Sequence, residues 1–490
     1  MLTTLRSERG PQVKIDFLHN WAPSAGRVLQ IRPTAAATEA AAAAPVSPGM
    51  ASFLQQDHLD AYRRTVASGG THRAWTGTAS HQSGQLDEQA LAGALRRFVL
   101  RHEGLRTWFD FSGEETARRL VAPNDIVFEA IELDTAPTGD AWAEQWEQYV
   151  VGLADDVCRP DSWPPFLLLA VAREDGWSWL WACDHAFTDG ASQLMVPAEL
   201  ANAYAEETGA PSFELPPAAS FVDYATAERE RAGTYGLESP ELLGWLDIMK
   251  RHDYRLPHFP LDLGLEPGET APVVLREMDA LLGDEIEAFE QLCRASGGRF
   301  LSGVFAMLAR AERRLAGTDR YLAATVVGTR ASETAMSHGW FCNFAPVDFA
   351  VGDEPFSATV AAAEEAYAVT KQLAAMPVHV ALGALLLSGL TTMEQLGSPQ
   401  LVSYLDLRKF PGSGTEAYDR GQHFTGVGRT GNASLWINRE PGRLQLGGQT
   451  PDTPQAQTAV DTFFATVRSV LKEALAEASE GGAIGAGHHS

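Results

Sequence analysis

The chain has few cysteines and no short cysteine motif. It contains 490 residues but only four cysteines, Cys158, Cys183, Cys293 and Cys342, with no close spacing between any two. Neither a disulfide framework nor a zinc site built on paired thiolates is therefore indicated. The glycine-rich loops carry no phosphate-binding signature either. The sequence implies no metal and no cofactor.

Basic residues and long apolar runs are also scarce. Lys and Arg number 38 against 63 Asp and Glu, a net charge of -25, which argues against general nucleic-acid binding. The longest apolar run, residues 378–387, is too short to span a bilayer, and we interpret it as a buried helix. Residues 1–9 lack the apolar core of a secretion signal. We therefore expect a cytoplasmic protein with no membrane span.

Strands and helices alternate in both halves of the chain. Residues 165–172 and 177–182 form two apolar runs joined by the charged turn 173–176, which predicts neighbouring buried strands. This alternation predicts an α/β (α+β) fold with layered sheets and helices, and the length indicates two or more globular units. The other main expectations are helices at 86–100, 283–296, 300–315 and 453–478, strands at 272–278 and 321–328, and a hairpin at 433–448.

One histidine, His185, lies in a predicted loop, a position where catalytic residues are common. His185 leaves the end of the second apolar run and enters a turn that contains Asp189 and Gly190. Loops presented by a rigid scaffold often carry functional side chains. A histidine titrates near neutral pH and is the commonest general base. The alternative is that His185 is a structural residue packed beside aromatic side chains.

The pattern His185-x-x-x-Asp189-Gly190 resembles the signature of the condensation-domain superfamily, which includes chloramphenicol acetyltransferase and the polyketide-associated acyltransferases. Many members have two histidines at the start of the motif, whereas here the first position is Asp184. The Gly-Trp-Phe sequence at 339–341 most resembles the polyketide-associated acyltransferases within this superfamily. Four further segments resemble family elements in the expected order: 47–59, 101–109, 220–225 and 338–347.

The resemblance implies a two-lobed architecture. Two chloramphenicol-acetyltransferase-like lobes would form a V with a tunnel between them and His185 at its middle. We expect an N-terminal lobe at 1–215, a connector at 216–269, a C-terminal lobe at 270–480 and a flexible tail at 481–490. A crossover near 401–430 would begin at the strand 401–408.

The resemblance also implies roles for individual residues. His185 would be the catalytic base or would position the nucleophile, and both roles stay open. The Gly190 N–H would stabilise the oxyanion. Asp189 would form a structural ion pair with Arg330 of the second lobe, and Asp184 would face away from the acceptor and act on the scaffold. The expected tunnel-lining residues are Trp340, Asn343 and Ser403.

The function implied is a stand-alone acyltransferase of secondary metabolite or lipid biosynthesis. The donor would be a phosphopantetheine thioester on an acyl or peptidyl carrier protein, or an acyl-coenzyme A, and the acceptor a small molecule with a hydroxyl or amine. Docking a carrier protein would need a local basic area, for which Arg313-Arg314 and Lys250-Arg251 are the candidates. Two alternatives remain: condensation strictly between carrier-bound partners, and a catalytically silent binding or recruitment module, suggested by Asp184.

Overall fold

The chain forms two compact units that interleave along the sequence. The computed structural model describes residues 14–113, 115–410, 421–425 and 428–480. The first unit comprises Met1–Glu230, Arg330–Phe341 and Phe410–Val427, and the second comprises Arg231–Thr329, Cys342–Lys409 and Gly428–Ser490.

These units differ from the predicted lobes at several boundaries. The first unit continues to Glu230 and takes in two later segments, 330–341 and 410–427. Most of the predicted connector, from 231 to 269, belongs to the second unit. The reason is that helix α7, Pro240–Arg251, buries Leu242 and Trp245 in a core of that unit. The predicted tail at 481–490 lies outside the described residues.

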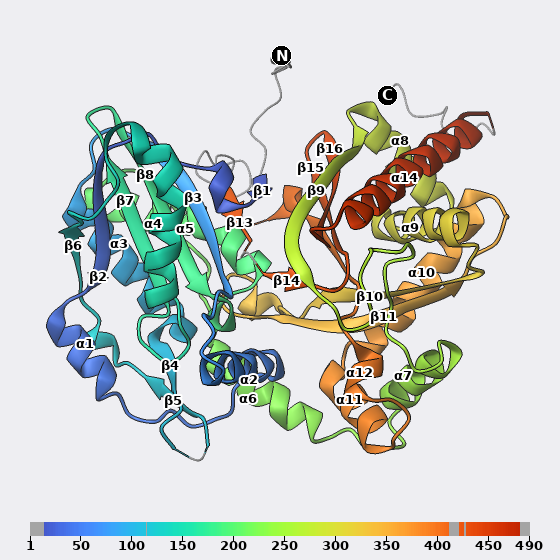
Figure 1. The fold of residues 1–490 in the computed structure, drawn as a ribbon, viewed down its shortest axis with the longest axis horizontal. Coiled ribbons are helices and arrows are strands. Elements are labelled where there is room, and N and C mark those ends of the chain that lie inside the picture. The colour runs from blue at the N-terminus through green and yellow to red at the C-terminus, as the bar shows by residue number, and fades with distance from the viewer. Residues whose placement is uncertain (1–13, 114, 411–420, 426–427, 481–490) are drawn as a thin grey trace. The chain divides into compact units, whose positions relative to one another are not determined.

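The first unit is built on a seven-stranded sheet (Figure 1). All neighbouring strands are antiparallel except β1 and β13, which are parallel. The predicted strand pair is present as β7 and β8. In spatial order the strands are β1 Lys14–Asp16, β13 Gln422–Phe424, β3 Trp75–Ser83, β8 Gly176–Asp184, β7 Phe166–Ala172, β2 Arg27–Pro33 and β6 Phe128–Glu132.

Helices cover both faces of this sheet, which explains the uninterrupted apolar character of its central strands. Leu168 and Ala170 of β7 face the core shared with α3, Glu88–Arg101, and α5, Gly190–Thr208. Leu167 and Leu169 face the core shared with α4, Trp142–Val157, on the other side (Figure 1). A strand buried on both faces has no polar side to alternate with. This arrangement holds β8, and the residues that follow it, rigidly.

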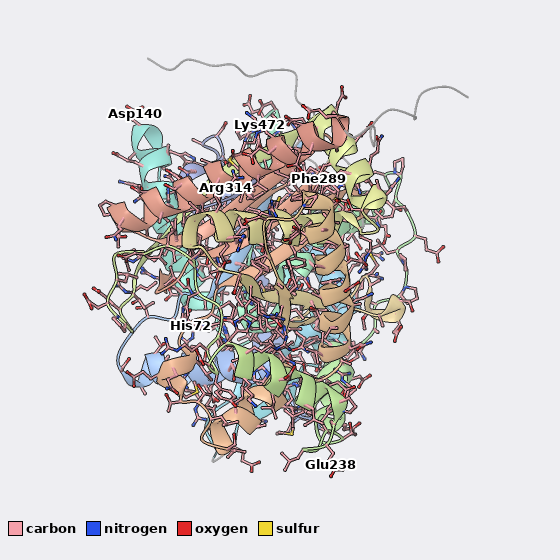
Figure 2. All side chains as sticks on the ribbon, turned by 90° about the vertical axis from the view of Figure 1, so that its right-hand side faces the viewer. His72, Asp140, Glu238, Phe289, Arg314 and Lys472 are labelled. Atoms are coloured by element: carbon pink, nitrogen blue, oxygen red, sulfur yellow. The ribbon has the colours of Figure 1, made fainter. Side chains whose placement is uncertain are left out.

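The second unit has a seven-stranded sheet of its own, in which β12 is parallel to both neighbours. Its main core is formed with α8, Asp284–Ala295, α9, Phe300–Ala316, and α14, Pro454–Glu480. Arg314 of α9 pairs with Glu473 of α14 at 2.6 Å (Figure 2). In order the strands are β11 Cys342–Ala350, β10 Arg320–Gly328, β12 Leu401–Asp406, β15 Ser434–Glu440, β16 Arg443–Pro451, β9 Ala271–Leu282 and β14 Arg429–Thr430.

Between β12 and β14 the chain contributes a strand to the sheet of the first unit. There β13 pairs with β1 in parallel and with β3 in antiparallel register. β14 then pairs with β9 in the sheet of the second unit. This stretch falls within the region 401–430 where the crossover was expected, although residues 411–420 and 426–427 lie outside the described residues.

The apolar run 378–387 is a helix, α11, Val378–Leu387, but the expectation that it is buried is wrong. Only Val378, Ala381 and Leu385 are buried, whereas Leu387 is 92% exposed, because one side of the helix packs in the core that includes α7. No single helix among the described residues has the length and apolar character to cross a membrane. α10, Phe356–Leu373, and α11 meet that test only as a pair, bent by 81°.

The remaining elements include one that matters for the site. Helix α2, Phe53–Ala67, is capped by Ser52, whose hydroxyl accepts a hydrogen bond from Gln55 N while the Gln55 side chain accepts from Ser52 N. This reciprocal cap fixes where the helix starts. The others are α1 Ala35–Ala42, α6 Phe221–Ala232, α12 Met393–Leu396, β4 Thr107–Asp110 and β5 Ala117–Leu120.

Close packing between α8 and α9 gives a first prediction. A Cβ added at Gly303 would fall within contact distance of Cys293 Sγ and 2.8 Å from Phe289 Cζ, which lies in α8 (Figure 2). We expect Gly303→Ala to lower the free energy of unfolding by about 1–3 kcal/mol through overpacking. Gly152→Ala in α4 is the control, because a Cβ there meets nothing within 4 Å. Equal stability of the two variants in urea denaturation would contradict this packing.

Candidate active site

The residue that ends β8 and the turn after it form the centre of the site. His185 opens a single 3₁₀ turn, η5, His185–Phe187, whose cap is the Asp184 side chain accepting from Ala186 N at 2.9 Å. His185 N donates to Ala74 O at 2.9 Å. The Gln55 side chain of α2 donates to Ala186 O at 2.8 Å. The turn is thus fastened to the segment before β3, to β8 and to α2.

The His185 ring is half-buried and packs against an indole. Its centroid lies 4.2 Å from that of Trp340. The ring Nδ1 is buried and has no hydrogen-bond partner among the residues that the structure describes. Burial, and secondarily the neighbouring His58, lower the pKa of His185 below its ordinary value. The imidazole is therefore neutral near pH 7, which is the form that accepts a proton.

Asp189 is engaged on both carboxylate oxygens. Arg330 Nη1 donates to Oδ2 at 2.7 Å and Nη2 to Oδ1 at 2.8 Å. Backbone N–H groups of Ser192 and Phe341 donate to the same oxygens at 2.7 and 2.9 Å. Burial alone would raise the pKa of Asp189, but Arg330 and these N–H groups outweigh it and hold the pKa below its usual range. The carboxylate serves the scaffold and caps α5.

Arg330 forms the ion pair that the resemblance implied, but from a different part of the fold. The resemblance assigned it to the second lobe, whereas the contacts place Arg330–Phe341 in the first unit. The reason is local: besides Asp189, the guanidinium donates to Ser192 Oγ at 2.7 Å and lies 4.7 Å from the Phe341 ring centroid.

Asp184 contacts two histidines. Its side chain is fully buried, with Oδ1 3.0 Å from His58 Nε2 and Oδ2 3.0 Å from His72 Nε2. Burial raises the pKa of this carboxyl, but the two imidazoles overcome that effect and lower it to about 2. No sequence argument singled out either histidine. His58 falls within the family-like segment 47–59, and that is the one signal that pointed to it.

Two other family-like segments meet beside this turn. His102 Nε2 lies 2.8 Å from Glu199 Oε2, and His102 Nδ1 accepts from His338 N at 3.2 Å. Gly339 N donates to Ser192 Oγ, which donates back to Gly339 O. His102 of segment 101–109 and the first residues of segment 338–347 are therefore hydrogen-bonded to each other and to α5, although the two segments are far apart in sequence.

The other predicted site residues fall into two groups. Gly190 is exposed at the first position of α5, and Trp340 contacts His185. Asn343 and Ser403 belong to the second unit. The Asn343 side chain is buried and makes four hydrogen bonds to backbone groups of Ala374, Met376, Phe344 and Val378. Ser403 is half-buried in β12. Their predicted role as tunnel lining stays a prediction.

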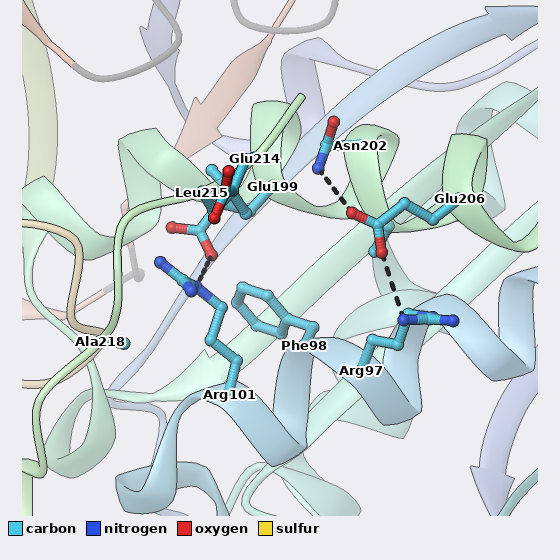
Figure 3. A pocket seen from close by; sticks show the side chains of 10 residues that line it. Arg97, Phe98, Arg101, Glu199, Asn202, Glu206, Glu214, Leu215 and Ala218 are labelled. Atoms are coloured by element: carbon cyan, nitrogen blue, oxygen red, sulfur yellow. Dashed lines mark hydrogen bonds and ion pairs between the residues drawn. The ribbon is translucent and has the colours of Figure 1, made fainter. Parts of the chain in front are cut away.

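A separate polar hollow of about 460 Å³ lies between α3 and α5 (Figure 3). Both arginines that line it are paired: Arg101 with Glu199 at 3.3 Å and Arg97 with Glu206 at 3.2 Å. His185 does not line it. The hollow is therefore distinct from the turn that carries His185.

Comparison with known proteins places this geometry in a family. Residues 67–380, more than half of the chain, match the condensation domain. Acyltransferase PapA3 of Mycobacterium tuberculosis (strain CDC 1551 / Oshkosh) is 28% identical over 477 residues, covering 94% of this chain and 97% of that protein. The 2'-acyl-2-O-sulfo-trehalose (hydroxy)phthioceranyltransferase PapA1 of the same strain is 26% identical, covering 94% and 88%.

A solved structure described as PapA2 acyl transferase matches with a TM-score of 0.84 and 25% identity, covering 94% of this chain and 99% of that one. The chain therefore belongs to the condensation-domain family, and it is an acyltransferase. The resemblance drawn from the motifs and the mixed α/β class are both confirmed.

The buried ion pair gives a second prediction. Asp189→Asn leaves the Arg330 charge buried without its partner, so we expect a loss of about 3–5 kcal/mol in the free energy of unfolding. The pKa of Asp189 is lowered in the folded state. The stability it contributes is therefore present above the unfolded-state pKa of about 3.9 and lost as the pH falls through the folded pKa.

The control is Asp175→Asn. Asp175 also faces an arginine, Arg173 at 3.3 Å, but is 84% exposed. A surface pair of this kind contributes about 0–1 kcal/mol. Urea denaturation at neutral pH compares the two variants. Equal free energies of unfolding for Asp189→Asn and Asp175→Asn would show that the buried Asp189–Arg330 pair does not stabilise the fold.

Proposed function

We propose that the protein transfers an acyl group from a thioester to a hydroxyl or amine of a small acceptor, with His185 as general base. The observation that carries this proposal is the imidazole of His185, whose pKa is lowered by burial, in a turn that hydrogen bonds to Gln55 and Ala74 fix at the end of a buried strand. Such a base contributes roughly 10²–10⁴-fold to the rate of proton transfer.

The reaction runs in two steps. His185 takes the proton of the acceptor as the acceptor atom attacks the thioester carbonyl, which becomes a tetrahedral oxyanion. The oxyanion then collapses, the carbon–sulfur bond breaks, and the imidazolium returns the proton to the leaving thiolate. The products are the ester or amide and a free thiol, and His185 is neutral again.

Gly190 is the proposed donor to the oxyanion. It is the first residue of α5, and the first N–H groups of a helix have no acceptor within the helix. The helix dipole adds a partial positive charge at this end. The next turn is fixed because Ser192 N is held by Asp189. Asp189 thus acts in the proposal as a positioning residue, by holding the start of α5 in place.

The acceptor is proposed to be a hydroxyl, which gives an ester. PapA1 is named as a transferase for a sulfated, acylated trehalose, so that relative acts on a sugar derivative. At 26% identity this supports a hydroxyl acceptor for the present chain but does not specify the sugar.

The donor is proposed to be an acyl-coenzyme A or another small thioester, ahead of a carrier protein docked at the candidate basic sites. Three of the arginines or lysines considered for docking are neutralised by acidic neighbours: Arg313 by Asp353, Arg314 by Glu473, and Arg251 by Asp348. The surface around them therefore offers little net positive charge to an acidic carrier protein.

A third prediction tests this function. His185→Ala should reduce kcat/KM for acyl transfer by about 10²–10⁴-fold, with thermal stability retained, because it removes the base and leaves the ion pair intact. Product formation is followed by mass spectrometry with acyl-coenzyme A and acyl-pantetheine donors against sugar alcohols and amines. His19→Ala, at an exposed histidine of the first unit, is the control. Full turnover by folded His185→Ala would refute the assignment.

A further inference from the structure

Two histidines of the first unit, His58 and His72, contact the same buried carboxylate, that of Asp184. His58 comes from α2. His72, which Figure 2 labels, comes from the segment between α2 and β3. Each has its Nε2 3.0 Å from an oxygen of Asp184, and each side chain is 8% exposed. Their rings meet edge to face at 5.0 Å. By distance to Asp184 and by burial the two histidines are equivalent.

They differ in what else they contact. The His58 ring centroid lies 6.4 Å from that of His185 and 6.0 Å from that of Trp340, so it adjoins both rings of the site. The His72 ring instead meets Tyr62 at 4.9 Å, within the packing of α2. Only one of two otherwise matched imidazoles therefore faces the proposed base.

We propose that His58 is a positioning residue for the reaction: anchored by Asp184, it supports Trp340 against His185 and opposes a positive charge on the His185 ring. The inference rests on the proposed function, because it concerns the base that His185 supplies. It also accounts for the departure from the two-histidine motif. Where many members have the first histidine of the motif, this chain has Asp184, and Asp184 binds a histidine from α2, His58.

The charges around His185 set the sign of the effect. His58 disfavours a positive charge on His185, whereas Asp184 and Asp189 favour it, and burial acts in the same direction as His58. Asp189 is paired with Arg330 and Asp184 with both histidines, which weakens the influence of the two carboxylates. His58 is the neighbouring ring that acts on His185 in this direction, and its removal takes that influence away while Asp184 stays in place. The pKa of His185 should then rise.

The experiment compares His58→Gln with His72→Gln in the full chain. NMR spectra of protein labelled in the histidine rings follow the titration of His185, assigned by the loss of its signals in His185→Ala. We expect the His185 midpoint to move to higher pH in His58→Gln and to stay unchanged in His72→Gln. A merely structural cluster predicts the same response from both variants, since both lose one contact to Asp184.

Activity supplies the second measurement. The acid limb of the kcat/KM profile should move to higher pH in His58→Gln, so the loss is larger in acid than at alkaline pH, and the His72→Gln profile should match the wild type. Thermal denaturation checks both proteins, and His58→Asn replaces His58→Gln if that variant does not fold.

Two results would count against the inference in different ways. No shift in the His185 midpoint, or equal shifts in both variants, overturns the role of His58 while leaving the general base untouched. A shift in the midpoint without any change in the pH profile contradicts His185 as the base, and the catalytic role of His58 falls with it.

Discussion

The arrangement of the site depends on a buried carboxylate–guanidinium pair. Asp189 and Arg330 are 141 residues apart and join through two hydrogen bonds in the interior of the first unit. Removing two charges from water is costly, and the attraction repays that cost only with good geometry and further hydrogen bonds. The Ser192 and Phe341 N–H groups supply those bonds. The pair therefore couples the start of α5 to segment 330–341, and so brings Trp340 to His185.

Two carboxylates flank His185 in sequence, and both serve the scaffold. Asp189 binds Arg330, and Asp184 binds His58 and His72. Neither acid would itself exchange protons near neutral pH, because both have lowered pKa values. In the proposed reaction, proton transfer falls to His185, whose own ionisation is disfavoured by burial.

The sequence predicted those parts that depend on local pattern. β7 and β8 could be recognised because burial on both faces gives unbroken apolar runs, and α14 because Thr453 caps its first turn. His185 was singled out by its place after an apolar run and by motif resemblance, and the Asp189–Arg330 ion pair by the resemblance alone. The unit boundaries could not be predicted, because segments 330–341 and 421–425 join the first unit through contacts distant in sequence. The same holds for His72, which meets Asp184 across 112 residues from outside any regular element.

The position of β13 has a consequence for biosynthesis. Strand β13 lies between β1 and β3 in the sheet of the first unit, so among the described residues β1 is hydrogen-bonded into that sheet through a segment made late. Arg330 is likewise made after the carboxylate that it neutralises. Domains ordinarily fold one after another as they leave the ribosome. Here the amino-terminal half emerges with a sheet edge and a buried charge still incomplete, and the finished site must await the synthesis of most of the chain.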